Sequence, residues 1–179
     1  KKAIAKFDLV YMVEGYTDVV SMHQCGIENV VANSGKALSV FQIKLLRRFT
    51  SNIVLLYDGD EAGQHAALRG TDMLMSEGMN VKVLLLPDGK DPDELARNLT
   101  AEAFRKYIEE NQTDFIVFKI NVLLRGVTDP VKRSEAINSI VQSIAVIKDP
   151  ILRHLFARVC TQNGNEREHA YCTDEPFHL

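Results

Sequence analysis

The stretch IVLLYDGDEAG, residues 53–63, decides the fold that we predict for this chain. Its first five residues are all apolar or aromatic, which is typical of a strand buried on both faces of a parallel sheet. Asp58 and Asp60 follow at once, on either side of Gly59. Open α/β sheets bind their ligands at the carboxyl ends of the strands, and this spacing directs both carboxylates to one side of an extended segment.

Two carboxylates held this close repel each other unless a cation lies between them. Oxygen ligands of this hard type favour Mg²⁺ or Mn²⁺. A second interpretation needs no metal, because Asp60 is also a suitable N-cap for a helix that begins at Glu61. The pattern around Asp58 and Asp60 alone leaves both interpretations open.

Acidic residues also follow two other predicted strands. Residues 9–13 (LVYMV) form an apolar strand that ends at Glu14 and Gly15, and a strand over residues 81–86 is followed by Asp91 and Asp93. Three of the four predicted strands therefore place acids at one edge of the sheet. This convergence favours the metal site over simple helix capping.

The order of the predicted elements indicates an α/β fold with a parallel four-stranded sheet flanked by helices. Strands alternate with helices up to residue 99, as right-handed crossovers require, and the helices start at Thr17 or Asp18, at Ser39 with Gln42 as a capping box, and at Asp60. From Thr100 onward only helices are predicted, over 100–109, 114–124, 129–148 and 149–161. We predict a catalytic domain over 1–99, a helical subdomain over 100–161 and a loosely ordered tail over 162–179.

Two apolar stripes in the helical region, one around Ile140 and Ile144 and the other including Ile151 and Leu155, predict contacts between helices. A predicted helix over about 61–77 carries small residues, Gly70 among them, that let it lie close to the sheet.

The composition describes an ordinary water-soluble chain. It has 179 residues, of which 46% are hydrophobic and 25% charged, and its net charge is −3, which is not the strongly basic charge of an autonomous nucleic-acid binder. Its apolar runs are too short to cross a membrane. The three cysteines are far apart in the sequence and lack metal-ligand spacing, so we expect a reducing, cytoplasmic environment. The chain opens without methionine, and we expect it to begin inside a longer protein.

Three motifs in register give a resemblance to a known family. VEGYTDV at 13–19, YDGDEAG at 57–63 and LPDGKDPDE at 86–94 resemble the Toprim domain of bacterial replicative DNA primases of the DnaG type, over about residues 8–98. The resemblance implies an acidic cluster that holds two Mg²⁺ or Mn²⁺ ions for nucleotidyl transfer, with Glu14 as a metal ligand or a proton-transfer group. The implied members are Glu14, Asp58, Asp60, Asp91 and Asp93, with Asp18 close by.

The same resemblance implies that backbone at Gly15, Ser34, Gly35 and Gly59 approaches the phosphates. Lys36 departs from the family, which usually has a small hydroxyl residue there, and it is interpreted either as a phosphate contact or as a solvated loop residue.

The family implies synthesis of short RNA primers from ribonucleoside triphosphates on single-stranded DNA at the cytoplasmic replication fork. We expect the zinc-binding domain, most of the basic template groove and the helicase-binding domain of such an enzyme to lie outside these 179 residues. The isolated chain is therefore expected to bind metal but to bind DNA weakly. The alternatives are a Toprim nuclease, a phosphatase with Asp58 as nucleophile, and a non-catalytic docking module.

Overall fold

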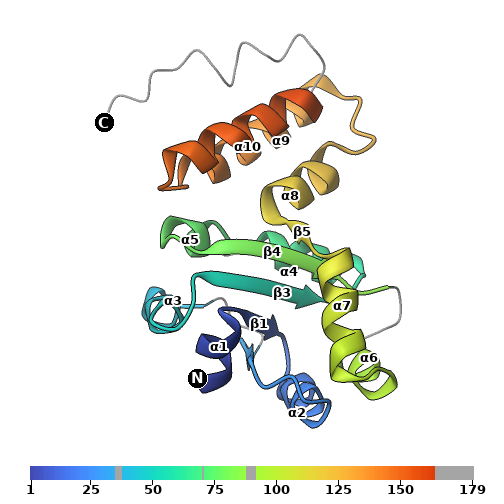
Figure 1. The fold of residues 1–179 in the computed structure, drawn as a ribbon. Coiled ribbons are helices and arrows are strands. Elements are labelled where there is room, and N and C mark those ends of the chain that lie inside the picture. Colours follow the sequence, from blue (N-terminus) through green and yellow to red (C-terminus); the bar gives the residue numbers. More distant parts are fainter. Residues whose placement is uncertain (35–37, 70, 88–91, 164–179) are drawn as a thin grey trace. The chain divides into compact units, whose positions relative to one another are not determined.

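A computed structural model of the chain describes residues 1–34, 38–69, 71–87 and 92–163 (Figure 1). The chain divides into two compact units, residues 1–115 and residues 116–179. Helix α7 (Ala101–Asn111), which we had assigned to the helical region, belongs to the first unit because Phe104 and Ile108 lie in its core. The domain boundaries at 99 and 161 stay a prediction.

The first unit is built on a mixed five-stranded sheet. The strand order is β2 (Val30–Ala32), β1 (Val10–Val13), β3 (Asn52–Tyr57), β4 (Asn80–Leu85) and β5 (Thr113–Asp114). The first four strands are parallel, as predicted, whereas β5 pairs with β4 in the antiparallel direction. The predicted count of four strands was wrong by one, because a two-residue strand is too short to show an alternating pattern.

Helices cover both faces of this sheet. Alternate strand residues such as Tyr11, Val54 and Leu84 form one core with residues of α2 (Tyr16–Gln24), α6 (Pro92–Asn98) and α7. Helices α4 (Glu61–Leu68) and α5 (Thr71–Ser76) contact β3 and β4. The intervening residues of these strands, Leu55 and Val83 among them, are buried as well. This unit also contains α1 (Lys2–Phe7) and α3 (Val40–Arg47). The burial of both faces explains the uninterrupted apolar runs of β1 and β3.

Several helix boundaries follow local signals. The predicted capping box at α3 is confirmed: Ser39 Oγ accepts from the Gln42 N–H (3.3 Å), and Gln42 Oε1 accepts from the Ser39 N–H (2.9 Å). The predicted start of α2 at Thr17 or Asp18 was wrong, because Gly15 is the N-cap. Asp18 lies at the third helical position, where its carboxylate accepts from the Gly15 N–H at 3.0 Å.

The long helix predicted over about 61–77 is interrupted. Helix α4 ends at Leu68, and Arg69 adopts an extended conformation (φ −85°, ψ 133°) before α5 begins at Thr71. Gly70, which we had placed on the inner face of this helix, lies outside the described residues. A glycine lowers helix stability at such a position, so the break falls beside a weak helix former.

The described part of the second unit, up to residue 163, contains all but the first residue of α8 (Phe115–Leu124), together with α9 (Pro130–Ala145) and α10 (Pro150–Asn163). Lys119 is buried and donates from Nζ to Ser139 O (3.0 Å) and Ser143 Oγ (2.6 Å), which ties α8 to α9. Ile140 and Ile144 are buried as predicted, but Ile151 and Leu155 are 71% and 51% exposed, so the predicted stripe of α10 is only partly a core contact. No helix within the described ranges has the length and apolarity that a membrane crossing needs.

Candidate metal and phosphate site

The carboxyl ends of the neighbouring strands β1 and β3 bring the first two candidate residues together. Glu14 follows Val13 directly and Asp58 follows Tyr57, and β1 and β3 are paired in parallel. Both acids line a hollow of about 230 Å³, together with Gly15, Asp18, Leu56 and Pro92. The predicted edge thus becomes a small, open and mainly acidic site.

The charges around this hollow shift the pKa of Glu14. Its pKa is raised above the ordinary value, first by partial burial and then by the negative charges of Asp58, Asp18 and Asp60. The positive charge of Arg69 opposes this rise in pKa. The negative charges of three aspartates thus act on Glu14, and this is repulsion that a bound divalent cation relieves.

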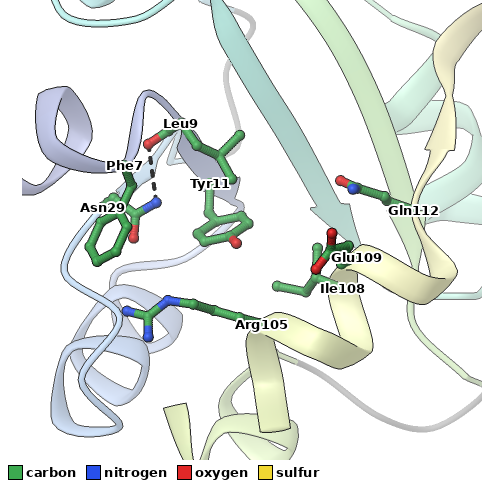
Figure 2. A pocket seen from close by; sticks show the side chains of 8 residues that line it. All are labelled: Phe7, Leu9, Tyr11, Asn29, Arg105, Ile108, Glu109 and Gln112. Carbon is green, nitrogen blue, oxygen red and sulfur yellow. Dashed lines mark hydrogen bonds between the residues drawn. The ribbon is translucent and has the colours of Figure 1, made fainter. Parts of the chain in front are cut away.

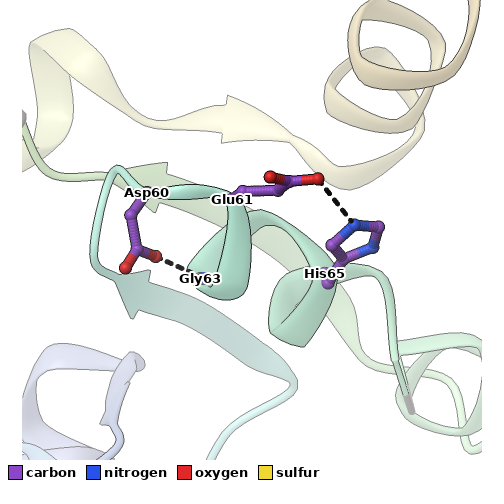
Figure 3. A network of polar contacts seen from close by, with 4 residues as sticks. All are labelled: Asp60, Glu61, Gly63 and His65. Atoms are coloured by element: carbon purple, nitrogen blue, oxygen red, sulfur yellow. Dashed lines mark hydrogen bonds and ion pairs between the residues drawn. The ribbon is translucent and has the colours of Figure 1, made fainter.

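Asp60 has a structural role in addition to its charge. Its Oδ1 accepts from the Gly63 N–H at 2.7 Å and caps α4, as Figure 3 shows. The two interpretations of Asp60 are therefore compatible, because a carboxylate that caps through one oxygen keeps the other oxygen for a cation. In the same view Glu61 and His65 form an exposed pair, 3.7 Å apart, on the outer side of α4.

Gly63 lies where α4 passes closest to the Asp58 backbone. A Cβ atom at this position would lie 2.1 Å from Asp58 O and 3.0 Å from the Asp58 carbonyl carbon. Only glycine allows α4 to begin this close to the strand end, so Gly63 fixes the backbone that presents Asp58. We did not predict this role, because the sequence shows a small residue but not what it contacts.

The remaining predicted residues have different outcomes. Asp18 is 9% exposed and lines the hollow, as does Gly15. Ser34 adopts a positive φ of 55°, and its N–H donates to Glu14 O at 3.0 Å, so this loop is held against the acidic site. Gly59 lies between the two aspartates in the turn after β3. Gly35, Lys36 and Asp91 and the side chain of Asp93 lie outside the described residues, so their predicted roles stay predictions.

Two further residues act on the site and were missed by sequence reasoning. Arg69 follows α4 and lowers the pKa of both Glu14 and Tyr57. The pKa of the buried Tyr57 phenol is raised, first by burial and then by Glu14, while Arg69 and a hydrogen bond with Asn33 oppose the rise. Arg69 lies eleven positions after Asp58 in the sequence, directly after the end of α4, so its effect on the site becomes apparent only in the folded structure.

The donor set suits a hard divalent cation, since Glu14, Asp18, Asp58 and Asp60 all offer carboxylate oxygens. Within the described ranges, no three histidine, cysteine or carboxylate side chains are already arranged as a metal cluster. Of the predicted ligands, Asp91 and the side chain of Asp93 lie outside these ranges. The residues present therefore fit Mg²⁺ or Mn²⁺ by chemistry and charge.

A second hollow, of about 280 Å³, lies at the amino ends of β1 and β2, opposite the acidic edge (Figure 2). Arg105 lies 4.8 Å from the Phe7 ring centroid and donates to Gly26 O at 3.0 Å. Asn29 Oδ1 and Arg105 Nε are buried there, and neither has a hydrogen-bond partner in the described part of the chain. One is an acceptor and the other a donor, and ordered water satisfies buried groups of both kinds. This hollow holds none of the predicted site residues.

Comparison with known families agrees with the fold. Residues 11–96 match the Toprim-like family, and residues 116–160 match the DnaB-helicase binding domain of primase. The first unit is thus a Toprim-like domain. The second match falls inside the chain, whereas we expected a helicase-binding domain only outside it.

Two proteins of similar sequence are DNA primases. A DNA primase of Clostridium acetobutylicum is 41% identical over 166 residues, which are 91% of this chain and 27% of that protein. A DNA primase of Staphylococcus aureus is 33% identical over 154 residues, 86% of this chain and 26% of that protein. The chain is therefore a relative of the bacterial DNA primases of the DnaG type, and it spans about a quarter of the length of these relatives.

Solved structures support the same relationship. The primase catalytic core of E. coli has a TM-score of 0.79 and 30% identity, with 92% of this chain and 55% of that chain covered. A DnaG primase catalytic domain bound to single-stranded DNA has a TM-score of 0.74 and 32% identity, with 88% and 54% covered.

Proposed function

We propose that this chain is part of the catalytic core of a DNA primase, in which the acidic edge of the Toprim-like sheet supports metal-dependent nucleotidyl transfer. The observation that carries the proposal is the convergence of Glu14 and Asp58 from adjacent strand ends, with Asp18 and Asp60 close enough to raise the pKa of Glu14. The relationship to DNA primases supports the reaction type.

The reaction joins a ribonucleoside triphosphate to a 3′-hydroxyl, so that a bond forms to the α-phosphorus and pyrophosphate leaves. Two bound Mg²⁺ or Mn²⁺ ions would stabilise the attacking and the leaving oxygen. Asp58 and Asp60 would hold these ions, with Asp91 and Asp93 as further ligands. Glu14 would complete the ligand set or, as its raised pKa allows, hold a proton near the reacting hydroxyl.

Arg69 supplies the one positive charge that we can assign to the acidic site in the described residues. It lies close enough to Glu14 and Tyr57 to lower the pKa of both groups. We propose that it contacts a phosphate of the substrate, since a guanidinium suits phosphate oxygens. Gly15, Ser34, Gly35 and Gly59 would let backbone approach the same phosphates, and Lys36 would either join them or remain in solvent.

The partners of the proposed primase are single-stranded DNA, ribonucleoside triphosphates and a replicative helicase. The similarity to a solved primase domain bound to single-stranded DNA supports the DNA partner. The match of residues 116–160 supports the helicase partner. The site of action that this proposal implies is the cytoplasmic replication fork.

A chimaeric protein tests the proposal directly. The matching segment of the Clostridium acetobutylicum primase is replaced by this chain, and RNA primer synthesis on a single-stranded template is measured with labelled ribonucleotides. Primers are expected from the chimaera and not from its Asp58→Asn variant, with the unmodified primase as the positive control. A chimaera that folds and binds template but cleaves DNA, or hydrolyses a phosphate ester, without making primers would favour the nuclease or phosphatase instead.

A further inference from the structure

Helix α3 presents an exposed face that combines an aromatic ring with positive charges. Phe41, Lys44, Leu45 and Arg48 recur at the spacing of one helix face, and we call these four residues the α3 face. Phe41 is 76% exposed and Leu45 is 36% exposed, whereas Ile43 on the opposite side of α3 is fully buried. An exposed phenylalanine at this level contributes nothing to the core, so the α3 face needs another explanation.

The segment around α3 is basic although the chain is acidic. Residues 29–57 contain Lys36, Lys44, Arg47 and Arg48 and no aspartate or glutamate. The whole chain holds 21 basic and 24 acidic residues, so the remainder holds 17 and 24. A polyanion is therefore repelled by most of this chain and attracted by this segment.

The charges on the α3 face are available to a partner. Lys44 and Arg48 are exposed, and neither makes an ion pair or a side-chain hydrogen bond with any residue in the described ranges. They lie one helical turn apart, about 6 Å along the axis. Two positively charged side chains at this separation, beside the exposed ring of Phe41, suit a partner that carries regularly spaced negative charges and flat groups.

The segment that leads into α3 starts at the acidic site. The Ser34 N–H donates to Glu14 O at 3.0 Å, and Ser39 caps α3 only five residues later. Five residues span at most about 18 Å, so the first turn of α3, which contains Phe41, lies within reach of a strand that passes the acidic edge.

We propose that the α3 face binds single-stranded DNA, with a base stacked on Phe41 and phosphates on Lys44 and Arg48. This inference rests on the proposed function, because it supplies a route for template next to the nucleotidyl-transfer site. Stacking on aromatic rings with basic side chains along the backbone is how single strands are bound without sequence preference. An acidic peptide would use the charges but would leave Phe41 unused.

Fluorescence anisotropy with a labelled oligothymidylate, measured from low to moderate salt, tests the α3 face. Phe41→Ala is expected to weaken binding about tenfold, since stacking contributes this order of affinity. The Lys44→Gln, Arg48→Gln double variant is expected to reduce the slope of log K against log salt by about 1.4, because each single-strand phosphate contact contributes about 0.7. The matched control is Lys2→Gln, Lys106→Gln, which removes the same charge from α1 and α7 and should keep the slope.

Several results would overturn the proposal: no binding by the wild-type chain at low salt, equal affinity in the wild type and Phe41→Ala, or an equal loss of slope in the control. Binding of oligoglutamate as tight as that of oligothymidylate would point to an acidic protein partner instead. Melting curves check that each variant folds. Manganese affinity, which depends on the acidic site and not on α3, shows separately whether the proposed catalytic function stands.

Discussion

Replacement of Gly63 by alanine changes the free energy of unfolding, and the sign of this change distinguishes two roles for the glycine. If Gly63 were only a small helical residue, alanine would stabilise α4 by about 1 kcal/mol. The structure predicts the opposite, because the new Cβ would lie 2.1 Å from Asp58 O. Overpacking of this kind costs about 1–3 kcal/mol and occasionally more, and here the obstacle is backbone, which has little freedom to yield.

Because the obstacle is backbone, the upper end of this cost applies, and after the helix-propensity gain of about 1 kcal/mol is subtracted the net expectation for Gly63→Ala is a loss of about 2 kcal/mol in the free energy of unfolding. Urea unfolding in EDTA, followed by circular dichroism, measures it. The neighbouring exposed Ala62→Gly is the matched control, because it reports the propensity term alone and should lose about 1 kcal/mol. An unchanged or higher stability of Gly63→Ala would refute the close approach of α4 to Asp58.

Three further predictions concern the same edge. Asp60→Ala should lose about 1 kcal/mol of stability because the cap on α4 is removed. Asp60→Asn keeps a capping side chain and relieves the repulsion between carboxylates, so it should melt above the wild type in EDTA. Equal melting temperatures of the two variants would contradict this. Burial and the charge of Asp58 raise the pKa of Glu14, so its contribution to stability is present below the ordinary pKa of 4.5 and is lost as pH rises through the higher folded pKa. Without metal, the melting temperature of the wild type should therefore fall as the pH rises just above 4.5, and the Glu14→Gln variant should show a smaller fall. Identical pH profiles of the wild type and the variant would exclude the raised pKa of Glu14. Finally, the isolated chain should make little or no primer in a template-directed assay, because net charge −3 leaves it without most of a basic groove, and efficient priming would overturn this.

The parts of the fold that were predicted correctly are those with local causes. Buried parallel strands such as β3 leave continuous apolar runs, and caps such as Ser39, Thr100 and Asp129 leave a polar residue before each helix. The residues at the carboxyl edge of the sheet follow from the direction of the strands alone. This is why Glu14 and Asp58 could be placed together before the strand order was known.

The missed features depend on contacts between distant residues. Strand β5 exists only because β4 offers a free edge. The influence of Arg69, directly after the end of α4, on Glu14 becomes apparent only in the folded structure. The exposure of Ile151 could not be predicted either, since an apolar stripe does not show which of its members meet a neighbour.

Manganese binding tests the central claim most directly. Isothermal titration of the chain with Mn²⁺ is compared with an Asp58→Ala, Asp60→Ala double variant, and with Glu61→Ala as a control from the outer side of α4. Binding by the wild type and the control, with at least a tenfold loss in the double variant, is the result predicted by the convergence of carboxylates at the ends of β1 and β3. Equal affinity in the wild type and the double variant would contradict the metal site and, with it, the proposed chemistry.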